Sequence, residues 1–260
     1  MYRLGGFVPL DGRVSWAPHL PGRAQPINSY VILDNPRPIL IDSGMAVHRS
    51  SVVRGAELLL GDQPAATAFL TRAELDCAGN VRDIHRVAPL AGLITGGTAN
   101  PFDQFDIVAG WADVFNHRQV LAQAPGEVTK MGDSQSVEIL PPPVRVLATY
   151  WVYDDRARTL FTSDFFGYTD VSECDPCVVL DGTTSSLDEE TARRHLLAKF
   201  GWLALADTTP LVDSLRTVVR GREIEVLAPT HGCVLRGAEM VQRHVEFAIR
   251  LLRSVGVQHA

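Results

Sequence analysis

Three loops of the sequence carry side chains that bind metal ions, and each loop follows an apolar run that reads as a strand. They are "FLTRAELDCAGN", "TSDFFG" and "APTHGC". Carboxylates, thiolates and imidazoles are the usual protein ligands of metal ions, and these loops supply all three: Glu74, Asp76, Cys77, Asp164 and His231. Loops at strand ends share one edge of a sandwich, so we expect these candidate ligands to fall at that edge.

The four cysteines suggest a second chemistry at the same edge. The stretch "CDPC" places Cys174 and Cys177 in a C-x-x-C turn, which lets two sulfurs hold one ion or two corners of a cluster. In an extended segment Cys233 points to the same face as His231. Cys77 also falls in a predicted loop, so all four cysteines lie in loops. We therefore predict a four-cysteine cofactor site, most simply a [4Fe–4S] cluster. Buried apolar thiols or a redox dithiol are the alternatives.

Alternating strand and helix patterns must position these loops. "SYVILD" and "PILID" predict a hairpin over 29–42, and a second hairpin is predicted in "VRVLATYWVYDDRARTLFTSD". Apolar spacing predicts helices at 46–60, 187–199, 208–219 and in "GAEMVQRHVEFAIRLLRS". Two halves of this kind indicate two sheets packed face to face with helices outside. The predicted fold is an α/β, four-layer αββα sandwich over a single domain, 1–260.

Composition excludes several classes of partner. The 24 Lys and Arg residues stand against 30 Asp and Glu residues, for a net charge of -6, and the basic residues are scattered. This argues against nucleic acid as a partner. No apolar run has the length of a signal peptide or of a membrane span, so we expect a cytoplasmic protein that does not contact membranes.

The order and spacing of four stretches resemble the metallo-β-lactamase fold over essentially the whole chain: "INSYVILDNPRPILIDSG", "FLTRAELDCAGN", "TYWVYDDRARTLFTSDFFG" and "LAPTHG". More narrowly they resemble its oxygen-binding di-iron branch, found in flavodiiron proteins, without the flavodoxin module. That branch uses an H-x-E-x-D-H loop. The resemblance implies that Glu74 and Asp76 match the loop carboxylates, Asp164 the bridging aspartate and His231 the last histidine.

Several ligands of that family are replaced in this chain. Arg72 and Cys77 stand at the two loop imidazoles, and Pro142 lies roughly where the middle histidine would be. A guanidinium is permanently cationic and repels metal ions. We therefore expect Arg72 to block one half-site and to pair with Glu74 or Asp164. The other half-site could hold one ion on these residues: Asp76, Cys77, Asp164 and His231.

Three functions follow, and the sequence leaves them open. The first is a redox or gas-responsive protein for oxygen or nitric oxide, with a [4Fe–4S] cluster on Cys77, Cys174, Cys177 and Cys233 in place of the di-iron centre. The second is a hydrolase that uses one Zn or Fe ion in the remaining half-site, with Asp164 as a ligand or as the candidate catalytic base. The third is a metal-free descendant that binds a ligand or a protein partner. Any enzyme would be an iron-dependent oxidoreductase or a metallo-hydrolase, and the resemblance implies a redox partner and a homodimer.

Two groups of aromatic and imidazole side chains are assigned to structure before function. We expect Phe165 and Phe166 to pack in the core. The histidines other than His231 show no metal-ligand spacing, so we expect them at the surface or on helix faces: His19, His48, His85, His117, His195, His244 and His259.

Overall fold

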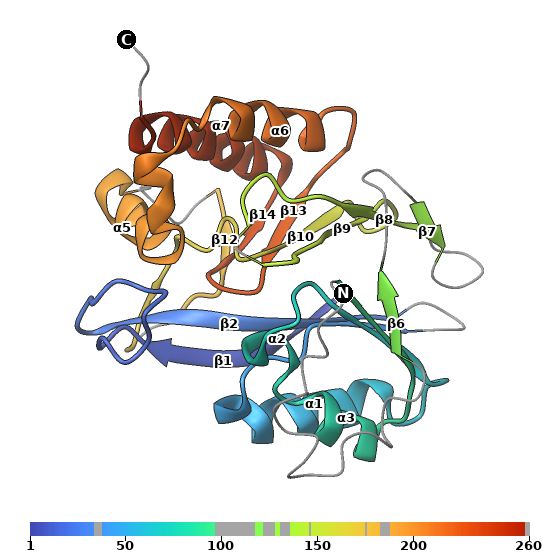
Figure 1. Ribbon diagram of the computed structural model, residues 1–260. Coiled ribbons are helices and arrows are strands. Elements are labelled where there is room, and N and C mark those ends of the chain that lie inside the picture. Colours follow the sequence, from blue (N-terminus) through green and yellow to red (C-terminus); the bar gives the residue numbers. More distant parts are fainter. Residues whose placement is uncertain are drawn as a thin grey trace.

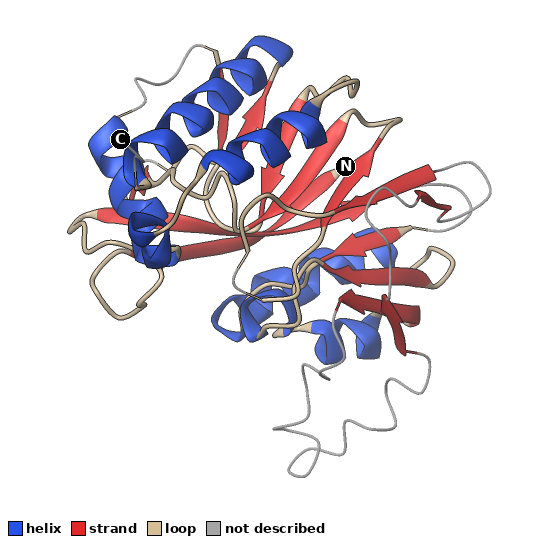
Figure 2. Cartoon of the chain, turned by 45° about the horizontal axis from the view of Figure 1, so that its top comes forward, coloured by secondary structure: helices blue, strands red, loops and turns tan. Residues whose placement is uncertain are grey.

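Two seven-stranded sheets lie face to face, and helices cover both outer faces (Figure 1). A computed structural model describes residues 1–33, 38–96, 118–121, 128–130, 136–145, 147–174, 176–182 and 188–257. Figure 2 shows the same layers by secondary structure, with the strands enclosed between two groups of helices. The predicted αββα sandwich is confirmed.

The first sheet has the strand order β1-β2-β3-β4-β5-β6. In addition, β11 pairs with Arg23 and Ala24 at the start of β2. The strands are β1 (Tyr2–Pro9), β2 (Arg23–Ile32), β3 (Ile39–Ile41), β4 (Ala66–Leu70), β5 (Leu90–Gly96), β6 (Arg118–Leu121) and β11 (Val171–Ser172). β2 and β3 are antiparallel, which confirms the predicted hairpin, although its turn lies outside the described residues. From β3 to β6 the strands are parallel, so the loops that follow them meet at one edge.

The helices of this half are η1 (Ala46–His48), α1 (Arg49–Leu60), α2 (Leu75–Ala78) and α3 (Val81–Val87). Helix α1 buries Val52, Ala56 and Leu60, which are four residues apart and therefore share one face. That face packs in a cluster with Leu40 and Ala68 of the sheet. The helix predicted over 46–60 is confirmed, with a first turn of 3-10 geometry.

The second sheet has the order β12-β14-β13-β10-β9-β8-β7. Its strands are β7 (Val128–Lys130), β8 (Ser136–Leu140), β9 (Trp151–Asp154), β10 (Thr159–Ser163), β12 (Val179–Asp181), β13 (Val226–Pro229) and β14 (Val234–Arg236). The predicted hairpin of β9 and β10 is confirmed, but β9 starts only at Trp151. The residues before it join the loop after β4 instead, because Tyr150 N donates to Thr71 O and Thr149 bridges to Arg72.

In the described part of the chain, the helices over the second sheet are α5 (Glu189–Lys199), η3 (Gly201–Leu205), α6 (Thr209–Val219) and α7 (Ala238–Val255). Asp188 caps α5 by accepting a hydrogen bond of 3.1 Å from Thr191 N. The predicted apolar stripe of α7 is buried along its length. No helix of the described residues is long and apolar enough to cross a membrane.

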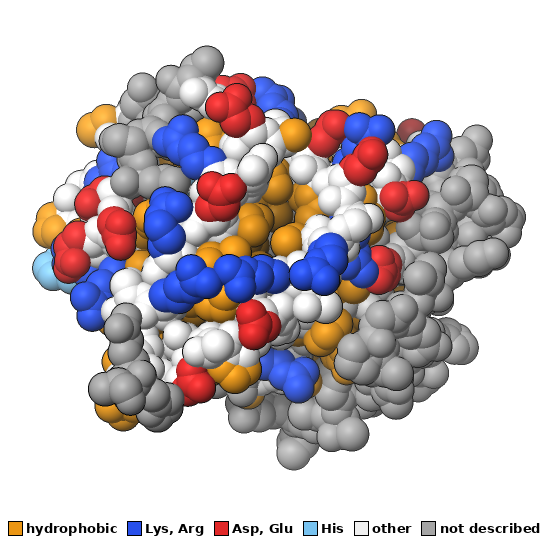
Figure 3. All heavy atoms as spheres, turned by 90° about the horizontal axis from the view of Figure 1, so that it is seen from above, with side chains coloured by type: hydrophobic (Ala, Val, Ile, Leu, Met, Phe, Trp, Pro, Cys, Tyr) orange, Lys and Arg blue, Asp and Glu red, His pale blue; other side chains and the backbone are white. Residues whose placement is uncertain are grey.

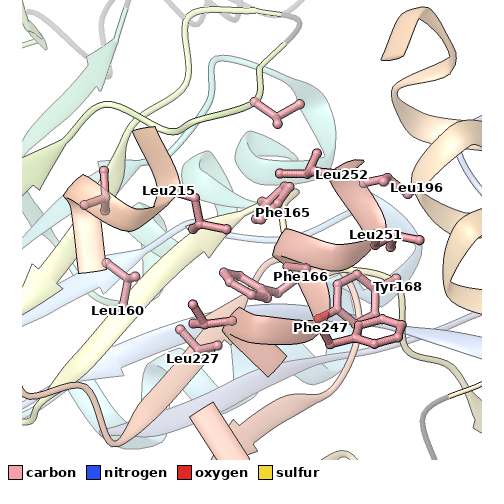
Figure 4. Close-up of a cluster of buried hydrophobic side chains, with 14 of the residues drawn as sticks. Leu160, Phe165, Phe166, Tyr168, Leu196, Leu215, Leu227, Phe247, Leu251 and Leu252 are labelled. Carbon is pink, nitrogen blue, oxygen red and sulfur yellow. The ribbon is translucent and has the colours of Figure 1, made fainter. Parts of the chain in front are cut away.

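The largest hydrophobic cluster lies between the second sheet and its helices (Figure 4). Phe165 and Phe166 are 2% and 1% exposed in it and meet edge to face, which confirms their core assignment. Leu215 of α6 and Leu227 of β13 are fully buried beside them. Each such leucine contributes about 1.5–3 kcal/mol when it leaves water, so this cluster anchors α6 and α7 to the sheet.

Two histidines lie on buried faces of their helices, α5 and α7, which agrees with the expected helix-face placement. His195 is 2% exposed and its Nε2 lies 2.8 Å from Asp170 Oδ2, while His244 is 0% exposed and its Nδ1 lies 3.2 Å from the Tyr168 hydroxyl. Each has a buried polar partner, which lets an imidazole sit inside a helix layer. His117 and His259 lie outside the described residues.

The outer face over α6 and α7 carries both signs of charge (Figure 3). Lys and Arg side chains form a row across it, and Asp and Glu side chains lie on both sides of the row. A nucleic-acid footprint needs a surface of one sign. On this face the two signs of charge are interspersed (Figure 3).

Candidate binding pocket and its charged base

A buried carboxylate ties together the loops that carry the candidate residues. Asp42, directly after β3, accepts hydrogen bonds from Thr71 N and Thr71 Oγ1 at 2.8 Å each and from Thr230 Oγ1 at 2.7 Å. Thr71 precedes Arg72 and Thr230 precedes His231. By binding both threonines, Asp42 positions Arg72 from the first sheet close to His231 from the second. Burial raises the pKa of Asp42 to about 6, and these hydrogen bonds oppose that rise. Sequence analysis missed this residue, although an aspartate that ends the strand "ILID" was a signal.

Arg72 lies between two aspartates at this edge. Its guanidinium forms ion pairs with Asp76 and with Asp164. The side chains of Arg72, Asp76 and Asp164 are 10%, 13% and 11% exposed, so the pairs are largely removed from water. The expected pair with Asp164 is therefore present. The second partner is Asp76, while Glu74 is an exposed residue at the start of α2.

A lysine that sequence analysis missed completes the base of the site. Lys199, the last residue of α5, places Nζ 2.6 Å from His231 Nδ1 and 3.2 Å from Asp164 Oδ1. An ammonium can only donate, so Nδ1 accepts and the remaining ring proton belongs on Nε2. His231 Nε2 lies 2.8 Å from Asp76 Oδ2. The imidazole thus links Lys199 to Asp76.

The burial of these groups and their mutual charges shift their pKa values. Burial, followed by the nearby Lys199 charge, lowers the pKa of His231 to about 3, which keeps the ring neutral. Burial and then the Arg72 charge lower the pKa of Lys199 to about 7. Burial alone would raise the pKa of Asp76, but His231 and Arg72 hold it well below its usual range.

The donor set does not fit the two-iron centre that the resemblance implies. Asp76, Asp164 and His231 do bring one donor atom each within 4.8 Å of one another, as the sole such group in the described part of the chain. However, Arg72 already forms ion pairs with both Asp76 and Asp164. Lys199 also contacts Asp164 and donates a hydrogen bond to Nδ1 of His231. Two cationic side chains already compensate the carboxylates, so two metal ions would add uncompensated positive charge.

Cys77 is not the loop residue that we expected. It lies in the short helix α2 and is 0% exposed, because that turn packs inward beneath the site. Its Sγ lies 3.9 Å from Thr71 Oγ1. Burial, then the charges of Asp42 and Asp76, raises the pKa of this thiol well above its usual range. Cys77 is absent from the group of converging donors, so a single ion on Asp76, Cys77, Asp164 and His231 lacks its thiolate in this arrangement.

The other cysteines form a separate neighbourhood. Cys174 and Cys177 are exposed in the loop before β12, while Cys233 is buried beside Ala24 and Val171. Cys233 Sγ lies 3.7 Å from the backbone oxygen of Cys177. Among the described residues, the hydrogen bonds of Cys77 lead to Thr71, Ser43 and Glu74, not to another cysteine. The predicted four-cysteine cluster stays a prediction.

A pocket of ≈ 680 Å³ opens above the charged base. Its base holds Arg72, Asp76, Asp164, Lys199 and His231, and its apolar walls come from both halves of the sandwich: Trp16, Met45, Val47, Leu75, Leu147 and Phe200. The Trp16 and His231 rings stack with centroids 5.6 Å apart. Small-molecule sites are typically apolar clefts of this size with a few convergent polar groups.

Solved structures with a similar fold include three flavodiiron-related proteins. Rubredoxin oxygen:oxidoreductase from the anaerobe Desulfovibrio gigas matches at a TM-score of 0.69 and 16% identity, over 96% of this chain and 59% of that one. The metal-soaked Flv1 flavodiiron core from Synechocystis matches at 0.63 and 19%, over 89% and 53%. A fragment of putative diflavin flavoprotein A 5 from Nostoc matches at 0.65 and 16%, over 98% and 97%.

These likenesses define the fold class. The chain has the metallo-β-lactamase-type sandwich of the flavodiiron core, and it spans little more than half the length of the first two structures. No family model matches the sequence, and no curated protein is similar enough to count as a relative. At identities below one fifth the likeness establishes architecture, and the chemistry must be argued from this chain's own side chains.

Proposed function

We propose that this protein binds a small apolar molecule in the pocket without a metal ion, and that Arg72 and Lys199 replace the two metal ions of a flavodiiron-type centre. The observation that carries the proposal is the Arg72 guanidinium between Asp76 and Asp164. The cations balance the carboxylates from within the chain. The space above them is left to a ligand, with apolar contact from Trp16 and Phe200.

Metal content after oxygen-free purification tests the first half of the proposal. We expect iron, zinc and acid-labile sulfide all far below one equivalent. Arg72→His supplies an imidazole at the position of the first loop histidine, whereas Arg72→Gln removes the charge without adding a ligand. Zinc titration by calorimetry should show tighter binding in Arg72→His alone. One tightly held ion in the wild-type protein would contradict the proposal.

Ligand binding tests the second half. We expect 2-naphthalenemethanol to bind the wild-type protein in calorimetry and to quench Trp16, which lines the pocket. Leu147→Glu places a charge in the pocket wall, and Leu58→Glu makes the same change on α1 away from it. These leucines are 45% and 78% exposed, so both variants should fold. Affinity should fall about tenfold in Leu147→Glu only, the size expected when about 1.4 kcal/mol of apolar contact is lost. Equal affinity in both variants would reject the pocket.

A metal-containing redox or gas-responsive protein is the second candidate function. It is supported by the neighbours, described as an oxygen:oxidoreductase and as flavodiiron proteins, and by the convergence of Asp76, Asp164 and His231. Its finer form is a [4Fe–4S] cluster on the four cysteines, which would require Cys77 to leave α2. The same metal and sulfide analysis separates it from the first candidate. A redox partner and a homodimer remain predictions under this second function.

A further inference from the structure

Lys199 is a rare residue type in an unusual place. The chain contains 24 Lys and Arg residues, and all but Lys130 and Lys199 are arginine. An arginine at 199 could form ion pairs as well, but a guanidinium does not act as a nucleophile, whereas a primary amine does. The side chain of Lys199 is 8% exposed and lines the base of the pocket. An amine therefore stands where a bound molecule would meet it.

The neighbours of Lys199 form a relay for protons. Lys199 Nζ lies 2.6 Å from His231 Nδ1, and His231 Nε2 lies 2.8 Å from Asp76 Oδ2. A nucleophile beside a base that a third group orients is the usual arrangement for covalent catalysis. The Asp76 carboxylate lies beside the ring and would compensate the imidazolium charge when Nδ1 takes a proton. Lys199, His231 and Asp76 match these three roles.

We propose that Lys199 captures the carbonyl group of an apolar aldehyde or ketone as an imine. Nζ of the neutral amine attacks the carbonyl carbon, so a C–N bond forms and the carbonyl electron pair moves to oxygen. His231 Nδ1 takes the proton from Nζ and returns it to that oxygen. A second transfer of the same kind lets the oxygen leave as water while the C=N bond forms. Water is the sole by-product and no electrons are exchanged with another molecule.

The pocket walls favour this product and define the class of compound. Apolar side chains of Trp16, Leu147 and Phe200 line the same pocket as Lys199. A ligand that covers the amine there would displace water, which favours imine formation because that reaction releases water. An aromatic or aliphatic body fits such walls, and its carbonyl must reach the base. This inference rests on the proposed function, because it requires a pocket that a ligand can enter.

Reductive trapping in the full-length protein tests the proposal. The protein is incubated with 2-naphthaldehyde and sodium cyanoborohydride, and intact mass and peptide mapping locate the adduct. The sequence contains three primary amines: the α-amino group, Lys130 and Lys199. We expect one adduct per chain, on Lys199, formed at least about tenfold faster than on the other amines, as positioned reactants allow. Adducts on the other amines at equal or greater rates would overturn it.

Two variants and one competitor separate chemistry from folding. Lys199→Arg keeps a cation but removes the amine, and should abolish the fast adduct. His231→Gln keeps the amine but removes the base, and should slow its formation. If either variant fails to fold, protection of Lys199 in the wild-type protein by 2-naphthalenemethanol still tests its location. Binding of the alcohol without trapping at Lys199 overturns this inference alone, whereas failure of both compounds to bind overturns the proposed function as well.

Discussion

The base of the pocket and the loop before β12 hold the two sets of reactive side chains, and they differ in burial. At the base, Arg72, Asp164 and Lys199 are 10%, 11% and 8% exposed, and Asp164 pairs with both cations. In the loop, Cys174 and Cys177 are exposed. A buried charge needs a partner, whereas an exposed thiol is solvated and needs none. The first region is therefore a network in which each member depends on the others, and the second is a set of independent groups.

Dependence on pH should separate the two regions most strongly. Burial lowers the pKa of His231 to about 3 in the folded protein, so folding favours the neutral ring. The stabilisation is present above the ordinary pKa of about 6.5 and is lost as the pH falls toward the folded value. Linkage gives a loss of roughly 3 kcal/mol between about pH 7 and pH 4. This value is for His231 alone. Asp76, whose pKa is also lowered, acts in the same direction, whereas Asp42, whose pKa is raised to about 6 by burial, acts in the opposite direction.

Urea unfolding at a series of pH values measures this loss. His231→Gln removes the titrating ring and should lose less stability on acidification than the wild-type protein, although its stability at neutral pH should be lower. His85→Gln, on α3 outside the pocket, is the matched control and should keep the wild-type profile. Equal slopes in all three proteins would contradict the assignment of the loss to the base of the pocket.

Removal of one carboxylate from the network should have the next largest effect. Asp164→Asn keeps the shape of the side chain but leaves Arg72 and Lys199 with less compensation, and breaking a buried pair costs about 3–5 kcal/mol. We expect the free energy of unfolding to fall by about 3 kcal/mol, because Asp76 still pairs with Arg72. Asp213→Asn breaks a surface ion pair in which Asp213 is 66% and Arg216 is 45% exposed. This change should cost no more than about 1 kcal/mol. Similar losses in the two variants would show that the network is not effectively buried.

Sequence patterns were sufficient for the layers and for part of the site. The β2 and β3 hairpin and the stripe of α7 carry apolar periodicity that leaves one arrangement for burial. The pairing of Arg72 with Asp164 was predictable because an arginine among carboxylates must find one. Lys199 was not, since it ends a helix that is distant in sequence from the loops and only the packing of α5 brings it to His231.

The position of Cys77 was predicted wrongly for a physical reason. The loop after β4 turns into the four-residue helix α2, which is too short to show an apolar period, and its inward face carries Cys77 and Ala78. A thiol packs as a small apolar group when its surroundings disfavour the charged form. Here burial raises the pKa of Cys77 most, the charges of Asp42 and Asp76 add to the rise, and the Arg72 charge opposes it only in part. The sequence showed a metal-ligand type, and the packing made it a core residue.

The smallest effects concern the thiols, and they test the division between the two regions directly. The thiolate is the reactive form, and burial raises the pKa of Cys77 well above its usual range and that of Cys233 to about 11. We expect Ellman's reagent to modify Cys174 and Cys177 at once and the two buried thiols only on unfolding. Cys77→Ala should cost about 1–2 kcal/mol through a cavity, and Cys177→Ala less than about 0.5 kcal/mol. A cluster on all four sulfurs would instead protect all four in oxygen-free protein and expose them together when it is removed.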